Sequence, residues 1–178
     1  MRWPIVTVPA YVIAGGALHF PGSLDAVGLE PGPLALGAVT GLLIGAAQLV
    51  ALRGVLLHPW LWPLATAAGM AITHAAGDGL SAAAGYLPVA IVGGIALGVS
   101  QGAVLRQPLW VLATAAGLFI GIYGGYTLAF GLGFNSIFEQ DALPRHASMT
   151  GLSAALYALF TAPIVARMRP PRRLTPAR

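Results

Sequence analysis

Few residues of this chain could do chemistry, and five of them fall at related positions. His19, Asp78 and Tyr126 each follow a tryptophan by sixteen residues, which on a helix places all three about 24 Å along at one angle. His74 shares a helix face with Asp78, and Tyr123 lies one turn before Tyr126. Such a cluster could bind a cation, relay a proton or hold a polar ligand. It could equally meet water and lipid headgroups, so both interpretations stay open.

Tests for familiar catalytic and metal chemistry are negative. The absence of cysteine excludes disulfides, thiolate metal sites and a cysteine nucleophile. His19, His74 and His146 have no recognised ligand spacing, so we predict no metal site, and a haem between His19 and His74 is disfavoured by a depth difference of about 6 Å. No serine stands in a nucleophile elbow, and no glycine-rich loop matches a phosphate cradle. We therefore expect a protein that is not an enzyme, and its cofactor, if it has one, is unknown from the sequence.

Composition indicates a membrane protein. The chain is 57% hydrophobic and 8% charged, with a mean hydropathy of +0.81, which leaves too few polar groups to cover a soluble globule. Each apolar run is close to the ~20 residues that cross a bilayer. The runs are about 3–20, 33–53, 61–78, 88–106, 109–131 and 148–168. We predict an all-α integral membrane bundle of six transmembrane helices, with the first retained rather than cleaved as a signal peptide. It forms one domain, 1–168, followed by a basic tail, 169–178.

Arginine placement predicts the orientation. Arg2, Arg53, Arg106 and the arginines between Arg167 and Arg178 flank the ends that six alternating spans bring together, and Arg145 alone falls opposite. By the positive-inside rule both termini should be cytoplasmic. The arginines stand singly or in the tail, which suits topology rather than nucleic-acid binding. The tail is expected to meet anionic lipid or a cytoplasmic partner.

Two sequence patterns repeat along the chain. GxxxGxxQxxxLR runs from Gly41 to Arg53 and again from Gly94 to Arg106. WxxxTAAG begins at Trp62 and at Trp110, and a weaker version begins at Trp3. These matches predict three pseudo-repeated helix hairpins. The hairpins are about 3–53, 61–106 and 109–168.

Glycines in these patterns are predicted to form helix-packing seams. Positions i, i+4 and i+7 lie within about 60° on a helix, and small residues there let backbones approach closely in lipid. In the last segment we align Gly151, Ala155 and Ala158 with the glycine–glycine–glutamine stripe, so that Ala158 replaces the glutamine. The expected seam residues are Gly41, Gly45, Gly69, Gly94, Gly98, Gly117 and Gly151.

A structural polar layer is predicted about 6 to 8 Å from the cytoplasmic end. Its expected members are Thr7, Gln48, Thr66, Gln101 and Thr114. Threonine hydroxyls and helix carbonyls can bind the glutamine amides and fix the register of the bundle, although a ring that contacts a substrate is the alternative. Tryptophans at this boundary are expected to anchor the chain in the membrane interface.

The tandem motifs resemble those of a group of bacterial polytopic membrane proteins, mostly without an assigned activity. The resemblance covers about residues 37–121 and rests on two sets of positions. These are Gly41, Gly45, Gln48, Leu52, Arg53, Trp62, Thr66 and Gly69, then Gly94, Gly98, Gln101, Leu105, Arg106, Trp110, Thr114 and Gly117. The resemblance implies a bacterial cytoplasmic membrane as the location and brings no activity.

A weaker resemblance is architectural. Six helices, cytoplasmic termini and Ala10-x-x-x-Ala14 look like the S-components of energy-coupling-factor vitamin transporters. Those proteins hold their ligand on the outer side, which would implicate His19, His74, Asp78 and Tyr126 here.

Two functional hypotheses follow. The first is a non-catalytic membrane subunit that packs, scaffolds or binds a hydrophobic cofactor, because small-residue seams abound and intramembrane ionisable groups are few. The alternative is a small-solute transporter, or its membrane-embedded binding component, that uses the outer polar cluster. Expected partners are membrane lipid and a protein partner or second copy within the membrane, with no nucleic acid.

Overall fold

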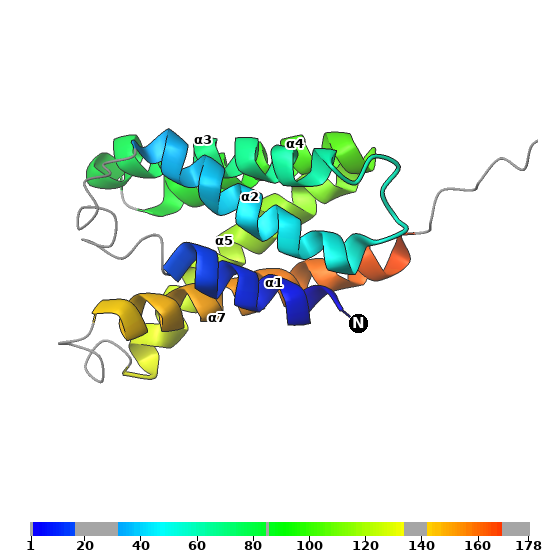
Figure 1. The fold of residues 1–178 in the computed structure, drawn as a ribbon. Helices are drawn as coiled ribbons and strands as arrows, with labels where there is room; N and C mark the ends of the chain where they lie inside the picture. Colours follow the sequence, from blue (N-terminus) through cyan, green and yellow to red (C-terminus); the bar gives the residue numbers. More distant parts are fainter. Residues whose placement is uncertain (1, 17–31, 85, 134–141, 169–178) are drawn as a thin grey trace, which may run out of the picture.

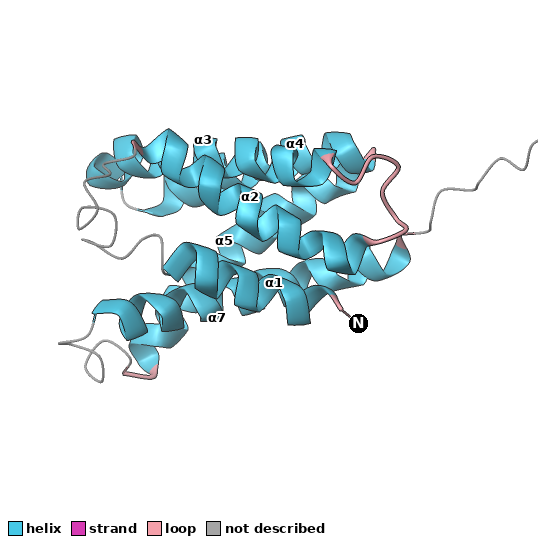
Figure 2. Cartoon of the chain, in the orientation of Figure 1, coloured by secondary structure: helices cyan, strands magenta, loops and turns pink. Residues whose placement is uncertain are grey.

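The computed structural model describes residues 2–16, 32–84, 86–133 and 142–168, and these residues are helical apart from short turns (Figure 2). Six α-helices follow the predicted runs, and a π-helical turn, Val12–Gly16, extends the first. The helices are α1 Trp3–Tyr11, α2 Pro33–Leu52, α3 Leu61–Ala84, α4 Tyr86–Leu105, α5 Pro108–Gly131 and α7 Ala142–Arg167. The predicted all-helical fold class is confirmed.

Local sequence explains where several helices begin and end. Pro33 and Pro108 occupy the first turns of α2 and α5, where a missing N–H leaves no bond unmade. Gly54 and Gly133 follow α2 and α5 with φ angles of 83° and 74°, a left-handed conformation that side chains other than glycine adopt at a cost. Arg106 takes this conformation after α4, with φ of 54°. Prolines therefore mark the starts of α2 and α5, and left-handed residues follow the ends of α2, α4 and α5.

Helices that are neighbours in sequence pack against each other, and α1 also packs against α7 (Figure 1). The bundle is thus a closed ring in the order α1, α2, α3, α4, α5, α7. The start of α1, the connection from α2 to α3 and the end of α7 lie at one end of this ring (Figure 1). Each helix therefore runs antiparallel to the next along the chain.

Among the described residues, four helical spans are long and apolar enough to cross a membrane: Pro33–Leu52, Leu87–Leu105, Pro108–Gly131 and Ala147–Arg167. The segment Trp3–Ala14 is apolar but shorter. Many large aliphatic side chains point outward, as at Ile5 (73% exposed) and Leu112 (68% exposed). An apolar exterior of this kind is the surface of a membrane protein.

Predicted seam glycines stand where two helix backbones touch. A Cβ atom at Gly41 would lie 2.5 Å from the carbonyl oxygen of Thr66 in α3. One at Gly94 would lie 2.7 Å from the Cα of Ala115 in α5. Contacts of the same kind occur at Gly45, Gly69 and Gly98, whereas Gly117 and Gly151 face side chains at 3.1 Å. The seams set the spacing of the ring, because backbones this close admit no larger residue.

The buried stripe of α7 differs from the one expected. Ala154, Ala158 and Thr161 are buried, with 2%, 0% and 0% exposure, whereas Gly151 and Ala155 are only half-buried. The stripe with the spacing of Gly41, Gly45 and Gln48 therefore starts three residues later than we aligned it. The alignment on Gly151 was wrong because it gave more weight to that glycine than to Ala154 and Ala158. Alanine also allows close helix packing.

Gly41→Ala tests the seam between α2 and α3. The added methyl group must separate two backbones, so we expect the free energy of unfolding to fall by about 1 to 3 kcal/mol despite the better helix propensity of alanine. Gly79→Ala is the matched control, because a Cβ there meets nothing within 4 Å. Thermal unfolding in detergent, followed by circular dichroism, measures both. Equal melting temperatures for the two variants would contradict the seam.

Candidate functional site

Three tryptophan rings meet at the axis of the bundle. Trp3, Trp62 and Trp110 are 2%, 0% and 0% exposed. Their ring centroids are 5.8 to 6.3 Å apart with edge-on geometry, which favours aromatic pairs. The expectation that they anchor the chain in the membrane interface was therefore wrong. They lie on α1, α3 and α5, the alternate helices of the ring, and so converge from three directions.

Each of these indoles donates a hydrogen bond to the helix that precedes its own around the ring. The acceptors are Gln48 Oε1 for Trp62 at 3.1 Å and Gln101 Oε1 for Trp110 at 3.0 Å. Trp3 donates to Thr161 Oγ1 at 2.9 Å, and this bond joins α1 to α7. Thr161, rather than Ala158, thus accepts the third indole N–H. Its own hydroxyl hydrogen goes to the Tyr157 carbonyl at 2.8 Å.

The predicted polar layer lies next to the tryptophans, and its threonines stand about one helical turn after them along α1, α3 and α5. Thr7, Gln48, Thr66, Gln101 and Thr114 are all fully buried. Gln101 Nε2 donates to Thr66 Oγ1 at 3.0 Å, and Thr66 in turn donates to the Trp62 carbonyl at 2.9 Å. Gln48 Nε2, Thr7 Oγ1 and Thr114 Oγ1 make no hydrogen bond. The polar side chains of the layer on α3 and α4 are therefore hydrogen-bonded, whereas those on the other helices keep at least one unbonded polar atom.

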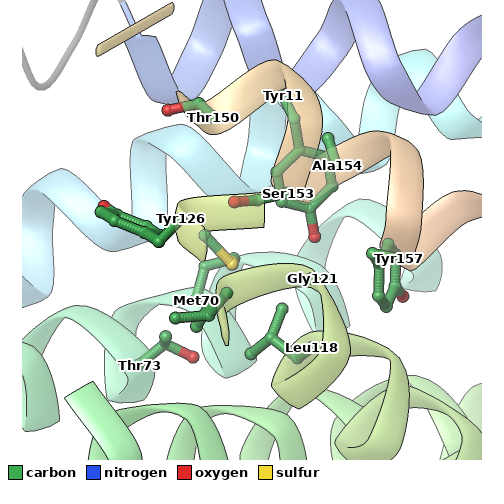
Figure 3. A pocket seen from close by; sticks show the side chains of 11 residues that line it. Tyr11, Met70, Thr73, Leu118, Gly121, Tyr126, Thr150, Ser153, Ala154 and Tyr157 are labelled. Atoms are coloured by element: carbon green, nitrogen blue, oxygen red, sulfur yellow. The ribbon is translucent and has the colours of Figure 1, made fainter. Parts of the chain in front are cut away.

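A cavity of about 160 Å³ lies further along the bundle axis than this layer, between α1, α3, α5 and α7 (Figure 3). Tyr11, Met70 and Leu118 each stand eight residues beyond a tryptophan, about 12 Å further along the axis. Small residues beyond them, such as Gly121 and Ala154, leave the space open. The lining residues are Tyr11, Met70, Thr73, Leu118, Gly121, Ile122, Tyr126, Thr150, Ser153, Ala154 and Tyr157.

Hydroxyl groups without partners give this cavity its chemistry. Tyr11 Oη and Ser153 Oγ are buried and make no hydrogen bond. Tyr157 Oη is likewise buried and makes no hydrogen bond. A buried polar group without a partner costs about 1 to 3 kcal/mol. The cavity therefore presents unused hydrogen-bond donors and acceptors on its wall.

The described lining carries no charged side chain and no histidine. A charged ligand would lose its hydration without gaining a counter-ion, so the cavity suits an uncharged one. The rings of Tyr11 and Tyr157 lie 5.9 Å apart and form an aromatic wall. Figure 3 shows Tyr126 and Tyr157 at opposite ends of this space.

The described residues of the predicted polar cluster take different positions. Tyr126 lines the cavity, whereas Asp78 is exposed and neither Asp78 nor His74 is among the lining residues. Tyr123 shares a neighbouring hollow with Tyr126, is 38% exposed and stacks on Phe119, with ring centroids 5.0 Å apart. His74 packs toward α2, where its Cβ lies 2.9 Å from a Cβ built on Gly37. Of the two described residues that follow a tryptophan by sixteen, Tyr126 therefore lines the cavity and Asp78 does not.

Two further predictions concern His19 and a metal site. His19 lies outside the described residues. Among the residues that the structure describes, no group of three His, Cys, Asp or Glu side chains could hold a metal ion.

Sequence reasoning missed Tyr11, Ser153 and Tyr157. Tyr11 lies one turn beyond Thr7 and two beyond Trp3, so a polar residue on a buried stripe was a usable signal. Ser153 and Tyr157 were hidden by the incorrect register of α7, because that register turned them away from the axis.

Comparison of the chain with protein-family models, curated proteins and solved structures finds no match.

Gln101→Leu tests the bonded part of the polar layer. It leaves the Trp110 indole without an acceptor, so we expect the free energy of unfolding to fall by about 1 to 3 kcal/mol. Gln107→Leu, at the exposed residue before α5, is the control. Adding Trp110→Phe to Gln101→Leu should cost less than the sum of the single changes, because the unpaired donor is then gone. Strict additivity in thermal unfolding would refute the coupling.

Proposed function

We propose that this chain is a non-catalytic integral membrane protein whose bundle binds a small uncharged ligand in the cavity between α1, α3, α5 and α7. The observation that carries the proposal is the pair of buried, unpartnered hydroxyls of Tyr11 and Ser153 in a cavity of about 160 Å³. Of the roles expected for a non-catalytic membrane subunit, this is the binding of a hydrophobic cofactor. The ligand is identified here only by its chemistry.

Size and chemistry support binding rather than catalysis. An apolar protein cavity of about 150 Å³ holds a benzene molecule, so the space here suits a ring with small substituents. Ser153 as a nucleophile would need a neighbouring base, and the described lining residues provide none. Hydroxyls that only donate and accept hydrogen bonds are suited to positioning a ligand.

A solute transporter that uses the outer polar cluster has less support. Among the described members of that cluster, Tyr126 lines the cavity, whereas Asp78 is exposed and His74 faces α2. Binding through Tyr11 and Ser153 needs no charged group. The transporter hypothesis would instead require His74 or Asp78 to reach the ligand.

We further propose that the bundle consists of three repeated units in a bacterial cytoplasmic membrane. The support is the set of three indole bonds, from Trp62 to Gln48, from Trp110 to Gln101 and from Trp3 to Thr161. In this arrangement the tryptophan of each later hairpin bonds to the second helix of the hairpin before it. The hairpins are 3–53, 61–106 and 109–168. The bond to Thr161 links the last hairpin back to the first.

We propose that both termini face the cytoplasm. The turns that carry Arg53 and Arg106 lie at the same end of the ring as Met168 at the end of α7, and residues from all three segments border one shallow hollow. Arginines gathered at one end of a membrane bundle favour the cytoplasmic side for that end. Lipid would then cover the apolar exterior, and a protein partner or second copy would compete for the same surface.

Tyr11→Phe separates ligand binding from stability. It removes an unpartnered hydroxyl without changing shape, so stability without ligand should be unchanged or higher, while ligand affinity falls about tenfold. Trp60→Phe, at an exposed position just before α3 and away from both hollows, is the control. Native mass spectrometry of the protein purified in mild detergent measures the co-purifying small molecule. Wild-type protein that carries no such molecule, or equal occupancy in Tyr11→Phe, would oppose the proposal.

Single cysteines test the orientation, because the natural chain has none. In intact cells a membrane-impermeant maleimide should label Gly32→Cys, at the outer start of α2, and spare His58→Cys, in the exposed α2–α3 connection. Lysed cells, in which both positions should react, provide the control. Labelling of His58→Cys alone in intact cells would reverse the topology.

A further inference from the structure

We infer that the ligand is a membrane lipid with an uncharged, oxygen-substituted ring as its headgroup, and that its apolar tail leaves the cavity along the outer half of α5. This inference rests on the proposed function and specifies the ligand class of the same site. The ring is of the quinone or phenol type, since both place oxygen atoms on a six-membered ring.

The first observation is a second hollow that continues the cavity. It has a volume of about 250 Å³ and is lined, among the described residues, by Ile122, Tyr123, Tyr126, Thr127 and Phe130. Ile122 and Tyr126 also line the inner cavity. A molecule that occupies both spaces therefore passes these two side chains.

The second observation is the direction of the outer hollow. Ile122, Tyr126 and Phe130 are spaced by four residues and form one stripe about 12 Å long on α5. Phe130 is 56% exposed and Tyr123 is 38% exposed, so the stripe opens to the apolar surroundings of the bundle. The stripe suits an alkyl or isoprenoid tail, because burying apolar surface against it is favourable while a water-soluble solute gains little there.

The third observation concerns the headgroup. The inner cavity places hydrogen-bonding oxygens on Tyr11 and Ser153 beside an aromatic wall that includes Tyr157, and Met70 contributes a polarizable sulfur. Carbonyl or phenol oxygens of a flat ring can bind these hydroxyls while its faces contact the aromatic rings. A phospholipid headgroup is excluded because the described lining offers its charge no counter-ion.

Binding measurements on the full chain in lipid nanodiscs test this inference. The probes are decylubiquinone, the same ring without its decyl tail, and para-nonylphenol. We expect a tailed ring to bind about tenfold or more tightly than the ring without a tail, which corresponds to roughly 1.4 kcal/mol. Tighter binding of decylubiquinone assigns the quinone type, and tighter binding of para-nonylphenol assigns the phenol type.

Two variants locate the tail. Phe130→Ala should reduce the preference for the tailed ring about threefold or more and leave affinity for the tail-less ring unchanged. Leu112→Ala, at an exposed position nearer the other end of α5, should change neither value. A tail-less ring that binds as tightly as the tailed ones, or a preference unchanged in Phe130→Ala, overturns the inference and leaves the proposed function standing. Failure of every probe to bind would also overturn the inference, and native mass spectrometry of the wild-type protein and Tyr11→Phe then decides the proposed function separately.

Discussion

The need to pair three indole N–H groups in an interior without water governs this structure. Trp3, Trp62 and Trp110 fill the axis at one end, and no bulk water reaches that depth to accept their hydrogen atoms. Each must therefore find an acceptor on a neighbouring helix, and Gln48, Gln101 and Thr161 supply one each. These bonds fix the axial register of three helix pairs. One of them closes the ring between the first and last helices.

Close backbone contact and an open cavity are consequences of the same stripes of small residues. Near the tryptophans, glycines such as Gly45 and Gly98 let helices approach until bulky rings fill the remaining axis. Two turns further along, the axial positions pass from tryptophan to Tyr11, Met70 and Leu118, and small residues follow. Side chains no longer fill the space, so the bundle is sealed by aromatic rings at one end and hollow beyond.

The proposed function rests on hydrogen bonds that the fold leaves unmade. In the polar layer, Gln101 and Thr66 satisfy each other and hold α4 against α3. Tyr11 Oη and Ser153 Oγ have no such partner, although both atoms are buried. Under the proposed function, a ligand that bonds to these hydroxyls would also stabilise the folded bundle.

The sequence by itself determined six helical segments and most of their contact faces, although α3 continues to Ala84 beyond the predicted end at 78 and α7 begins at Ala142 rather than at 148. Apolar length, prolines and glycine spacing are local properties, and they predicted six helices and the buried seams around Gly41 and Gly94. Only the tertiary structure decided what meets across the axis. It turned the tryptophans inward, chose Thr161 over Ala158, and assembled the cavity from four helices while leaving Asp78 outside. The physical reason is that equal depth along separate helices does not fix the rotation of each helix about its own axis, which packing against its neighbours sets.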